Sequence, residues 1–250
     1  MTIHYRTAEE IEKIRAANRI VAAALDRLET IVRPDITTLE LDREAEMVIR
    51  DMGGRPSFKG YRGFPNALCV AVNDQVVHGI PGKAALKEGD IIGLDVGVEK
   101  DGYYGDAART LYVGETKDEA RKLIEVTREA LMKGIGEIRP GARVSDISHA
   151  VQAHAESHGY SVVTAYVGHG IGSSPHEEPQ VPNFGRRGRG PILREGMVLA
   201  IEPMVNMGGS DVTLMADGWT VRTSDGSLSA HFEHSVAVVR GGSDVLSARL

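Results

Sequence analysis

The chain has 250 residues, of which 42% are hydrophobic and 26% charged, values typical of a globular protein with a sizeable core. Its net charge of -6 excludes the global basic field of a DNA-binding or membrane-surface protein. No apolar run is long enough to span a bilayer, and the first residues lack a signal-peptide pattern. The one cysteine, Cys69, excludes an internal disulfide, so a cytoplasmic protein is expected.

The first part of the chain predicts two helices followed by two short strands. A capping box at residues 7–10, with threonine first and glutamate three residues later, predicts a helix that Pro34 ends. Residues 38–52 repeat apolar side chains with helical spacing and precede two glycines, which predicts a second helix. Strands are expected at 68–72 and 75–78, around an Asn-Asp turn.

The stretch 91–113 predicts a long hairpin that carries two acids, and the rest of the chain is organised around it. Two apolar strands meet at Lys100-Asp101-Gly102, a tight-turn signal. A two-residue turn there places Asp95 and Asp106 on one face, because side chains alternate with period two. Neighbouring acids repel each other and resist burial. Either positive charge lies between them, or both face solvent at a sheet edge.

The second part of the chain predicts two more helices and further strands. The helices are expected at 116–138 and 144–157, the first stopped by Arg139-Pro140-Gly141. The other expected elements are, in order, a strand at 162–167, a long loop at 173–191, and strands at 197–205, 219–223 and 232–239, with a turn at 225–226.

The two parts repeat each other in a fixed order. The repeated pairs are Arg33-Pro34 with Arg139-Pro140, His78-Gly79-Ile80 with His169-Gly170-Ile171, residues 87–95 with 194–202, and Asp106 with Glu233. We therefore expect one domain over residues 1–250, built of two pseudo-symmetric halves at about 7–113 and 116–240. Their strands are expected to form one curved antiparallel sheet with helices on its outer side, an α+β fold.

Such symmetry brings four carboxylates together, from Asp95, Asp106, Glu202 and Glu233. This cluster cannot stay ionised without cations, since close like charges raise each other's pKa. With His169 the set suits two divalent ions about 3.5–4 Å apart, with a water or hydroxide between them. Zinc, manganese, iron and cobalt are all compatible, and an all-sulfur site is excluded because there is a single cysteine.

Five segments of the chain together resemble type I methionine aminopeptidases, members of peptidase family M24 with the pita-bread fold. They are NDQVVHGIP, LDVGVEKDGYYGDAART, GHGIGSSPHEEP, EGMVLAIEP and AHFEHSVAV. The resemblance implies a metal site in the concave face of the sheet, where Asp106 and Glu233 bridge both ions. It places Asp95 on one ion, and His169 and Glu202 on the other.

The resemblance also implies a reaction and its catalytic residues. A metal-bridged hydroxide is expected to attack the carbonyl carbon of the first peptide bond. His176 matches the family histidine that stabilises the oxyanion together with a metal, and His78 matches the one that contacts the scissile amide nitrogen. Glu202 is expected to carry a proton from water to the leaving amine.

A pocket for an unbranched thioether is implied beside the metal site. Sulfur–ring contacts contribute roughly 0.3–1.5 kcal/mol, so an aromatic and sulfur lining suits methionine. The residues that match the family's pocket positions are Tyr61, Phe64, Cys69 and Trp219, and Phe58 aligns close to these positions. Phe58 and Pro175 depart from the residues frequent in bacterial relatives, which predicts a narrower wall at one position and a more open one at the other.

The expected function is a metal-dependent aminopeptidase that removes the initiator methionine from nascent proteins when the second residue is small. One alternative is a proline-directed peptidase of the same fold, which usually carries a further N-terminal domain. Another is a peptide-binding module without catalysis, although such relatives lack the metal ligands. A type II methionine aminopeptidase is disfavoured, because no long helical insertion separates His176 from Glu202.

Other expectations concern partners and the remaining histidines. The protein is expected to be a monomer that acts on N-terminal peptides of nascent chains. The basic segment 185–190 is interpreted as a solvated loop, with contact to ribosomal RNA as the alternative. His231 shares a strand face with Glu233 and is interpreted as a structural histidine, with a role beside the metal ligands as the alternative. The histidines interpreted as solvent-facing or local are His4, His149, His154 and His158.

Overall fold

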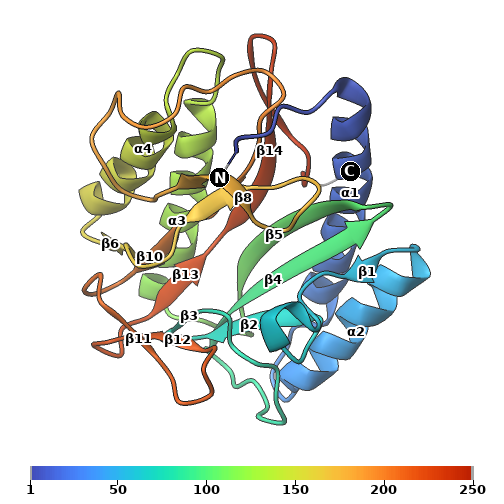
Figure 1. The fold of residues 1–250 in the computed structure, drawn as a ribbon. Helices are drawn as coiled ribbons and strands as arrows, with labels where there is room; N and C mark the ends of the chain where they lie inside the picture. The colour runs from blue at the N-terminus through green and yellow to red at the C-terminus, as the bar shows by residue number, and fades with distance from the viewer. Residues whose placement is uncertain (1, 249–250) are drawn as a thin grey trace.

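The computed structural model describes residues 2–248, which form a curved antiparallel sheet flanked by two pairs of helices (Figure 1). The α-helices are α1 (Ala8–Ile31), α2 (Thr38–Asp51), α3 (Asp118–Gly136) and α4 (Val144–Ser157), and η1 (Tyr61–Gly63) is a short 3-10 turn. The capping box predicted at the start of α1 is confirmed, since the Thr7 side chain accepts a hydrogen bond from the Glu10 backbone. The fold class predicted from the sequence is also confirmed.

The main sheet has nine strands, all paired antiparallel. They are β1 (Arg55–Pro56), β2 (Leu68–Val72), β4 (Ile91–Lys100), β5 (Tyr103–Tyr112), β7 (Gly168–Gly170), β8 (Glu177–Val181), β9 (Val198–Ile201), β14 (Glu233–Val239) and β15 (Gly242–Val245). The spatial order is β1-β4-β5-β14-β9-β7-β8, with β2 paired to β4 and β15 paired to β14. Strands from the two parts of the chain therefore meet where β5 pairs with β14.

Two smaller sheets of three strands complete the fold. One contains β6 (Ser161–Val162), β10 (Met204–Asn206) and β13 (Ser229–His231), and the other contains β3 (Gln75–Val77), β11 (Val212–Leu214) and β12 (Val221–Thr223). The division of the chain into two repeated halves stays a prediction. No helix among residues 2–248 combines the length and apolar character that crossing a membrane requires.

The predicted hairpin is confirmed, and its turn is Asp101-Gly102. Both turn residues have positive φ, 52° and 81°, the conformation of the tight turns that match strand twist. Asp95 pairs with Ala108 and Gly97 pairs with Asp106, so the two acids lie on one face two residues apart in register.

The hydrophobic core follows the helix pairs. Ile20, Leu25 and Leu28 of α1 belong to one buried cluster with Leu94 and Val98 of β4. A second cluster joins side chains of α3 and α4 to those of β9 and β14. In Figure 1 the pair α1 and α2 lies on one side of the sheet's long axis and the pair α3 and α4 on the other. Two pairs of amphipathic helices therefore pack against the sheet, one pair on each side of its long axis.

Two strand predictions in the second half are wrong. The strand expected at 162–167 is confined to Ser161–Val162, because the chain bends before β7. The strand expected at 197–205 is interrupted at Glu202 and Pro203 and becomes β9 and β10. Proline has no N–H to donate to a ladder, which explains the break directly after Glu202.

The predicted loop at 173–191 contains a strand, β8. This strand pairs with β7 through Gly168 and Gly170. A Cβ on Gly170 would lie 2.3 Å from the Glu178 carbonyl oxygen, so only glycine permits this approach. The sequence of β8 has no alternating pattern, which is why local analysis missed it. The strands β11, β13 and β15 were likewise not predicted.

Candidate metal centre

Three carboxylates lie on one face of neighbouring strands. Asp95 of β4 and Glu233 of β14 both pair with Ala108 of β5, so the three residues form a row across the sheet. Directly paired residues in an antiparallel ladder point to the same face, and Asp106 lies two residues before Ala108. The ladder register alone therefore brings Asp95, Asp106 and Glu233 together.

His169 and Glu202 join this face from the other end of the sheet. His169 of β7 pairs with Ala200 of β9, and Glu202 follows two residues later. The His169 Nε2 lies 3.4 Å from the Glu202 Oε1. Ligand atoms of Asp106, His169 and Glu233 all lie within 4.8 Å of one another. All five predicted ligands line one cavity of about 400 Å³.

The carboxylates repel one another in a poorly solvated space. Burial raises the pKa of Asp95 to about 7. Burial, followed by the charges of Glu233 and Asp95, raises the pKa of Asp106 well above its usual range. Burial and neighbouring carboxylates also raise the pKa values of Glu202 and Glu233. Protons or cations must therefore compensate the cluster.

Several of these oxygens have no hydrogen-bond partner in the described part of the chain. They are the Oδ1 atoms of Asp95 and Asp106 and the Oε1 of Glu233. Buried acceptors are normally satisfied, and an unpaired buried carboxylate is costly. Hard oxygen atoms left open toward one cavity are suitable ligands for divalent cations, so these residues fit a metal centre.

His169 is held in the tautomer that a metal requires. Its Nδ1 donates to the Gly170 carbonyl at 2.9 Å, and since a carbonyl can only accept, Nε2 keeps its lone pair. Burial lowers the pKa of His169 to about 3, so the ring is neutral at physiological pH. A neutral imidazole oriented by a backbone carbonyl is the usual form of a histidine ligand.

His78 and His176 line the same cavity as the carboxylates. The His176 ring stacks on Tyr61 at 5.3 Å and lies 4.3 Å from the His169 ring, measured between centroids. His78 has a φ of 59°, a left-handed conformation, directly before Gly79. Burial lowers the pKa of His78 to about 4, and burial also lowers that of His176. Both rings are therefore neutral and can donate one N–H.

An apolar wall occupies the rest of the cavity. All five predicted pocket residues contribute to it: Phe58, Tyr61, Phe64, Cys69 and Trp219. Phe64 meets Trp219 edge to face, with ring centroids 5.1 Å apart. A Cβ on Gly97 would lie 2.5 Å from the Phe58 ring, so Phe58 packs against the backbone opposite Asp106. The cavity therefore joins a charged floor to an aromatic wall.

Cys69 pairs with Asp95 in the ladder between β2 and β4. Burial, followed by the charge of Asp95, raises the pKa of the Cys69 thiol well above its usual range. The thiol therefore stays neutral and serves as apolar surface instead of a metal ligand.

His231 is a buried neighbour of the site whose position the sequence only partly indicated. Its Nε2 lies 3.9 Å from the Glu202 Oε2 and has no hydrogen-bond partner among the described residues. Thr110 exchanges two hydrogen bonds with the His231 backbone, at 2.8 and 2.9 Å. Tyr166 and Gln180 also line the cavity and were not predicted, since both lie in segments whose structure was misassigned.

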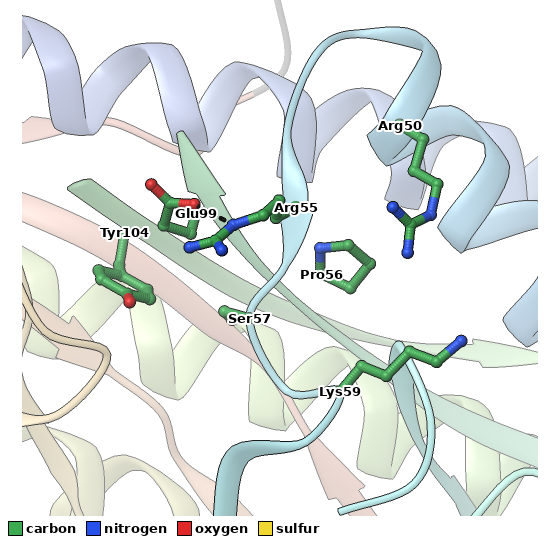
Figure 2. A pocket seen from close by; sticks show the side chains of 7 residues that line it. All are labelled: Arg50, Arg55, Pro56, Ser57, Lys59, Glu99 and Tyr104. Atoms are coloured by element: carbon green, nitrogen blue, oxygen red, sulfur yellow. Dashed lines mark hydrogen bonds and ion pairs between the residues drawn. The ribbon is translucent and has the colours of Figure 1, made fainter. Parts of the chain in front are cut away.

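A second hollow, of about 270 Å³, lies at β1 and is lined by none of the five predicted ligands (Figure 2). Its basic side chains are already paired. Arg55 contacts Glu99 at 2.6 Å, and Arg50 and Lys59 both contact Glu46 at 2.7 Å. Each basic side chain of the hollow therefore already has a carboxylate partner, whereas the larger cavity contains carboxylates without one.

A model of metallopeptidase family M24 matches residues 12–240. The chain belongs to this family. Methionine aminopeptidase 1 of Bacillus subtilis is 50% identical over 242 residues, which cover 97% of this chain and 98% of the relative. The resemblance to methionine aminopeptidases is thus confirmed, and this M24 member is a metal-dependent hydrolase.

Solved structures give the same assignment. The methionine aminopeptidase of Rickettsia prowazekii superposes with a TM-score of 0.98 at 44% identity, covering 99% of this chain and all of the other. Prolidase from Pyrococcus furiosus has a TM-score of 0.81 at 22% identity, and this chain covers 66% of it. The second likeness shows the fold alone. The observed sheet and four helices are the pita-bread fold of these proteins.

Proposed function

We propose that this chain removes the N-terminal methionine from nascent proteins whose second residue is small. One observation supports this most directly: five side chains of types able to bind metal line one cavity together with aromatic side chains and a sulfur atom. A peptide amine and its first carbonyl would lie over the floor, and an unbranched side chain would occupy the wall. A binding module has no need for such a costly cluster of buried acids.

Two divalent ions are proposed as cofactors, held by Asp95, Asp106, His169, Glu202 and Glu233. Asp106 and Glu233 would bridge both ions, Asp95 would bind one, and His169 and Glu202 the other. The unsatisfied carboxylate oxygens and the open His169 Nε2 support this assignment. Cobalt, manganese, iron and zinc all accept this mixture of oxygen and imidazole ligands. When bound, the ions polarise the scissile carbonyl and lower the pKa of water.

The proposed catalytic residues are Glu202, His78 and His176. Glu202 would transfer a proton from the attacking water to the leaving amine, and its place in the lining of the cavity beside the other acids supports that role. His176 would donate a hydrogen bond to the developing oxyanion, and His78 would contact the scissile amide nitrogen. Because both rings are neutral and held by aromatic neighbours, they can donate without first being deprotonated or reoriented.

The proposed methionine pocket is formed by Phe58, Tyr61, Phe64, Cys69 and Trp219. Its aromatic edges and neutral thiol suit a thioether, and sulfur–ring contacts contribute roughly 0.3–1.5 kcal/mol. A bulky second residue would collide with the pocket mouth, which sets the preference for small neighbours. Phe58, over Gly97, would narrow one wall, and Pro175 would open another.

The same proposal includes a cellular setting. The enzyme would act in the cytoplasm as a monomer on N-terminal peptides of nascent proteins, without a DNA or membrane partner. We assign any contact with the ribosome to the basic segment 185–190. Its arginines pair in part with the molecule itself, since Arg187 contacts Glu137. A solvated loop therefore remains the default interpretation of this segment.

A peptide-release assay tests the proposal. The protein is stripped with chelator, and manganese, iron, cobalt or zinc is restored before Met-Ala-Ser, Met-Leu-Ser and Ala-Pro-Ser are offered. Methionine release from Met-Ala-Ser alone, dependent on metal, is expected. Release from Ala-Pro-Ser would assign a proline-directed activity instead. If no amino acid is released with any metal, the result would favour a peptide-binding module whose metal site is intact but not catalytic.

A further inference from the structure

A second group of metal-ligating side chains lies outside the catalytic cavity, between two helices. Glu129 of α3, His154 of α4 and His158, the residue directly after α4, place ligand atoms within 4.8 Å of one another. The two histidines are four residues apart, so they share one face of α4. His154 was interpreted as solvent-facing or local; the structure leaves 14% of its side chain exposed and places its ring against Glu129.

The contacts within this group match the spacing of metal ligands. The His154 Nε2 lies 3.0 Å from the Glu129 Oε2. Two ligands bound to zinc at about 2.0–2.1 Å with tetrahedral angles lie about 3.3 Å apart, so only a small adjustment is needed. The His154 and His158 ring centroids are 4.7 Å apart. A cation between the three side chains would take the place of the direct contact between His154 and Glu129.

The tautomer of His158 also suits a ligand. Its Nδ1 lies 2.9 Å from the His154 carbonyl oxygen, which can only accept, so Nδ1 carries the proton. The Nε2 of His158 therefore keeps a lone pair for a metal. This is the arrangement in which a backbone carbonyl fixes the tautomer of a ligating histidine.

The packing of α3 against α4 positions Glu129 and His154, and the end of α4 favours positive charge. A Cβ on Gly134 of α3 would lie 2.8 Å from Val151 and 3.2 Å from Ile147 of α4, so the missing side chain allows close helix packing. Both histidines lie at the C-terminal end of α4, where unpaired carbonyl groups attract cations. Ligands on packed helices are positioned more accurately than ligands on loops.

We propose that Glu129, His154 and His158 bind a divalent transition-metal ion, with zinc as the best fit, and so link α3 to α4. Two imidazoles and one carboxylate suit zinc, cobalt or nickel, with water completing the coordination. This ion is additional to those of the catalytic cavity, and the proposal does not depend on the catalytic one. Metal analysis of the protein in excess zinc would then count one ion more than the catalytic cavity holds.

Zinc counting on matched variants tests the site. Wild-type protein, His158→Ala and the control His149→Ala, which changes a histidine elsewhere on α4, are equilibrated with excess zinc and then separated from free metal. His158→Ala is expected to retain one zinc fewer per chain than wild type, and His149→Ala the same number as wild type. Glu129→Gln provides a second variant that preserves the size of the side chain.

A spectroscopic readout keeps the test independent of activity. In ring-nitrogen NMR spectra, zinc added beyond the catalytic sites is expected to shift the resonances of His154 and His158 but not those of His149. It should also raise the melting temperature of wild type and not that of His158→Ala. Equal zinc counts for wild type and His158→Ala, or an unshifted His158 ring, would overturn the proposal whatever the peptide-release assay gives.

Discussion

The molecule contains two groups of histidine and carboxylate side chains with opposite electrostatic character. In the larger cavity, Asp95, Asp106, Glu202 and Glu233 crowd together around one imidazole, that of His169. Between α3 and α4, a single carboxylate meets two imidazoles near the surface. The first group has four carboxylates for one imidazole, so its negative charge needs compensation. The second has one carboxylate for two imidazoles and needs none. Burial and charge balance, more than residue type, therefore determine what each group requires.

This difference has an energetic consequence. Glu129 and His154 already satisfy each other at 3.0 Å, so their helix pair tolerates an empty site. Asp95 and Asp106 leave buried oxygens without partners, so the cavity is destabilising unless protons or cations enter. We expect metal to be essential in the cavity and optional between the helices.

The largest effect is expected from Asp106→Ala, which removes a proposed bridging ligand. Metal binding and peptide release should be lost together, by roughly 10³-fold or more, since bound metals supply several kcal/mol of transition-state stabilisation. Metal analysis and the Met-Ala-Ser assay measure the two losses. The exposed Asp118→Ala serves as the control. Full turnover by Asp106→Ala at ordinary metal concentrations would remove Asp106 from the site.

The cost of the buried acids should appear as a pH dependence of the metal-free protein. The folded-state pKa of Asp95 is raised to about 7, so folding favours its protonated form. Below the unfolded pKa, both states are protonated and stability is intact. As pH rises from about 4 to 7, the unfolded state loses this proton first, and stability falls by on the order of 4 kcal/mol.

The variant Asp95→Asn tests this contribution together with the effect of the Asp95 charge on the neighbouring carboxyl groups. In chelator, its free energy of unfolding relative to wild type should increase between about pH 4 and pH 7 and then level off. Urea unfolding at a series of pH values measures it. Subtracting the wild-type curve from the variant curve cancels most of the contribution of the buried histidines. Their lowered pKa values make the folded state less stable as the pH falls, whereas the raised pKa of Asp95 makes it more stable. A flat difference would mean that Asp95 is not held in a raised-pKa environment.

A smaller loss is expected from His176→Ala, which leaves the ligand set intact. Turnover should fall by about 10²–10³-fold, the usual effect of removing one donor to an oxyanion. Metal content should stay normal, because the His176 ring stacks on Tyr61 beside the ligands without belonging to them. Single-turnover kinetics and metal analysis separate the two properties. A metal-free variant would contradict the proposed role.

The smallest effect is expected at the helix pair in chelator. Breaking the partly exposed contact between His154 and Glu129 should change the free energy of unfolding by about 1 kcal/mol or less. A double-mutant cycle of His154→Ala and Glu129→Ala measures the coupling. A coupling free energy as large as that of a buried network would contradict the interpretation that the group between α3 and α4 tolerates an empty metal site.

Local patterns predicted much of this molecule. The capping box at Thr7 marked the start of α1, and the turn Asp101-Gly102 fixed the register of β4 and β5. That register already placed Asp95 and Asp106 on one face. Fold, family and activity then followed from motifs spread along the chain. The roles of the individual site residues stay predictions until metal and activity are measured.

Other features could not be predicted, because they depend on contacts between distant segments. The strand β8 exists because Gly168 and Gly170 allow close pairing, not because its own sequence alternates. The position of His231 beside Glu202 depends on how β13 packs under the cavity. The group formed by α3 and α4 likewise arises from helix packing at Gly134.

The sequence by itself determined the helices, the central hairpin and the set of side chains able to bind metal, because caps, periodicity and turns act over a few residues. Only the tertiary structure decided which of these side chains meet, how deeply each is buried and which oxygens remain unpaired. Burial and charge interactions depend on neighbours far away in the chain. The same residue types therefore form a strained acidic cavity in one place and a balanced surface group in another.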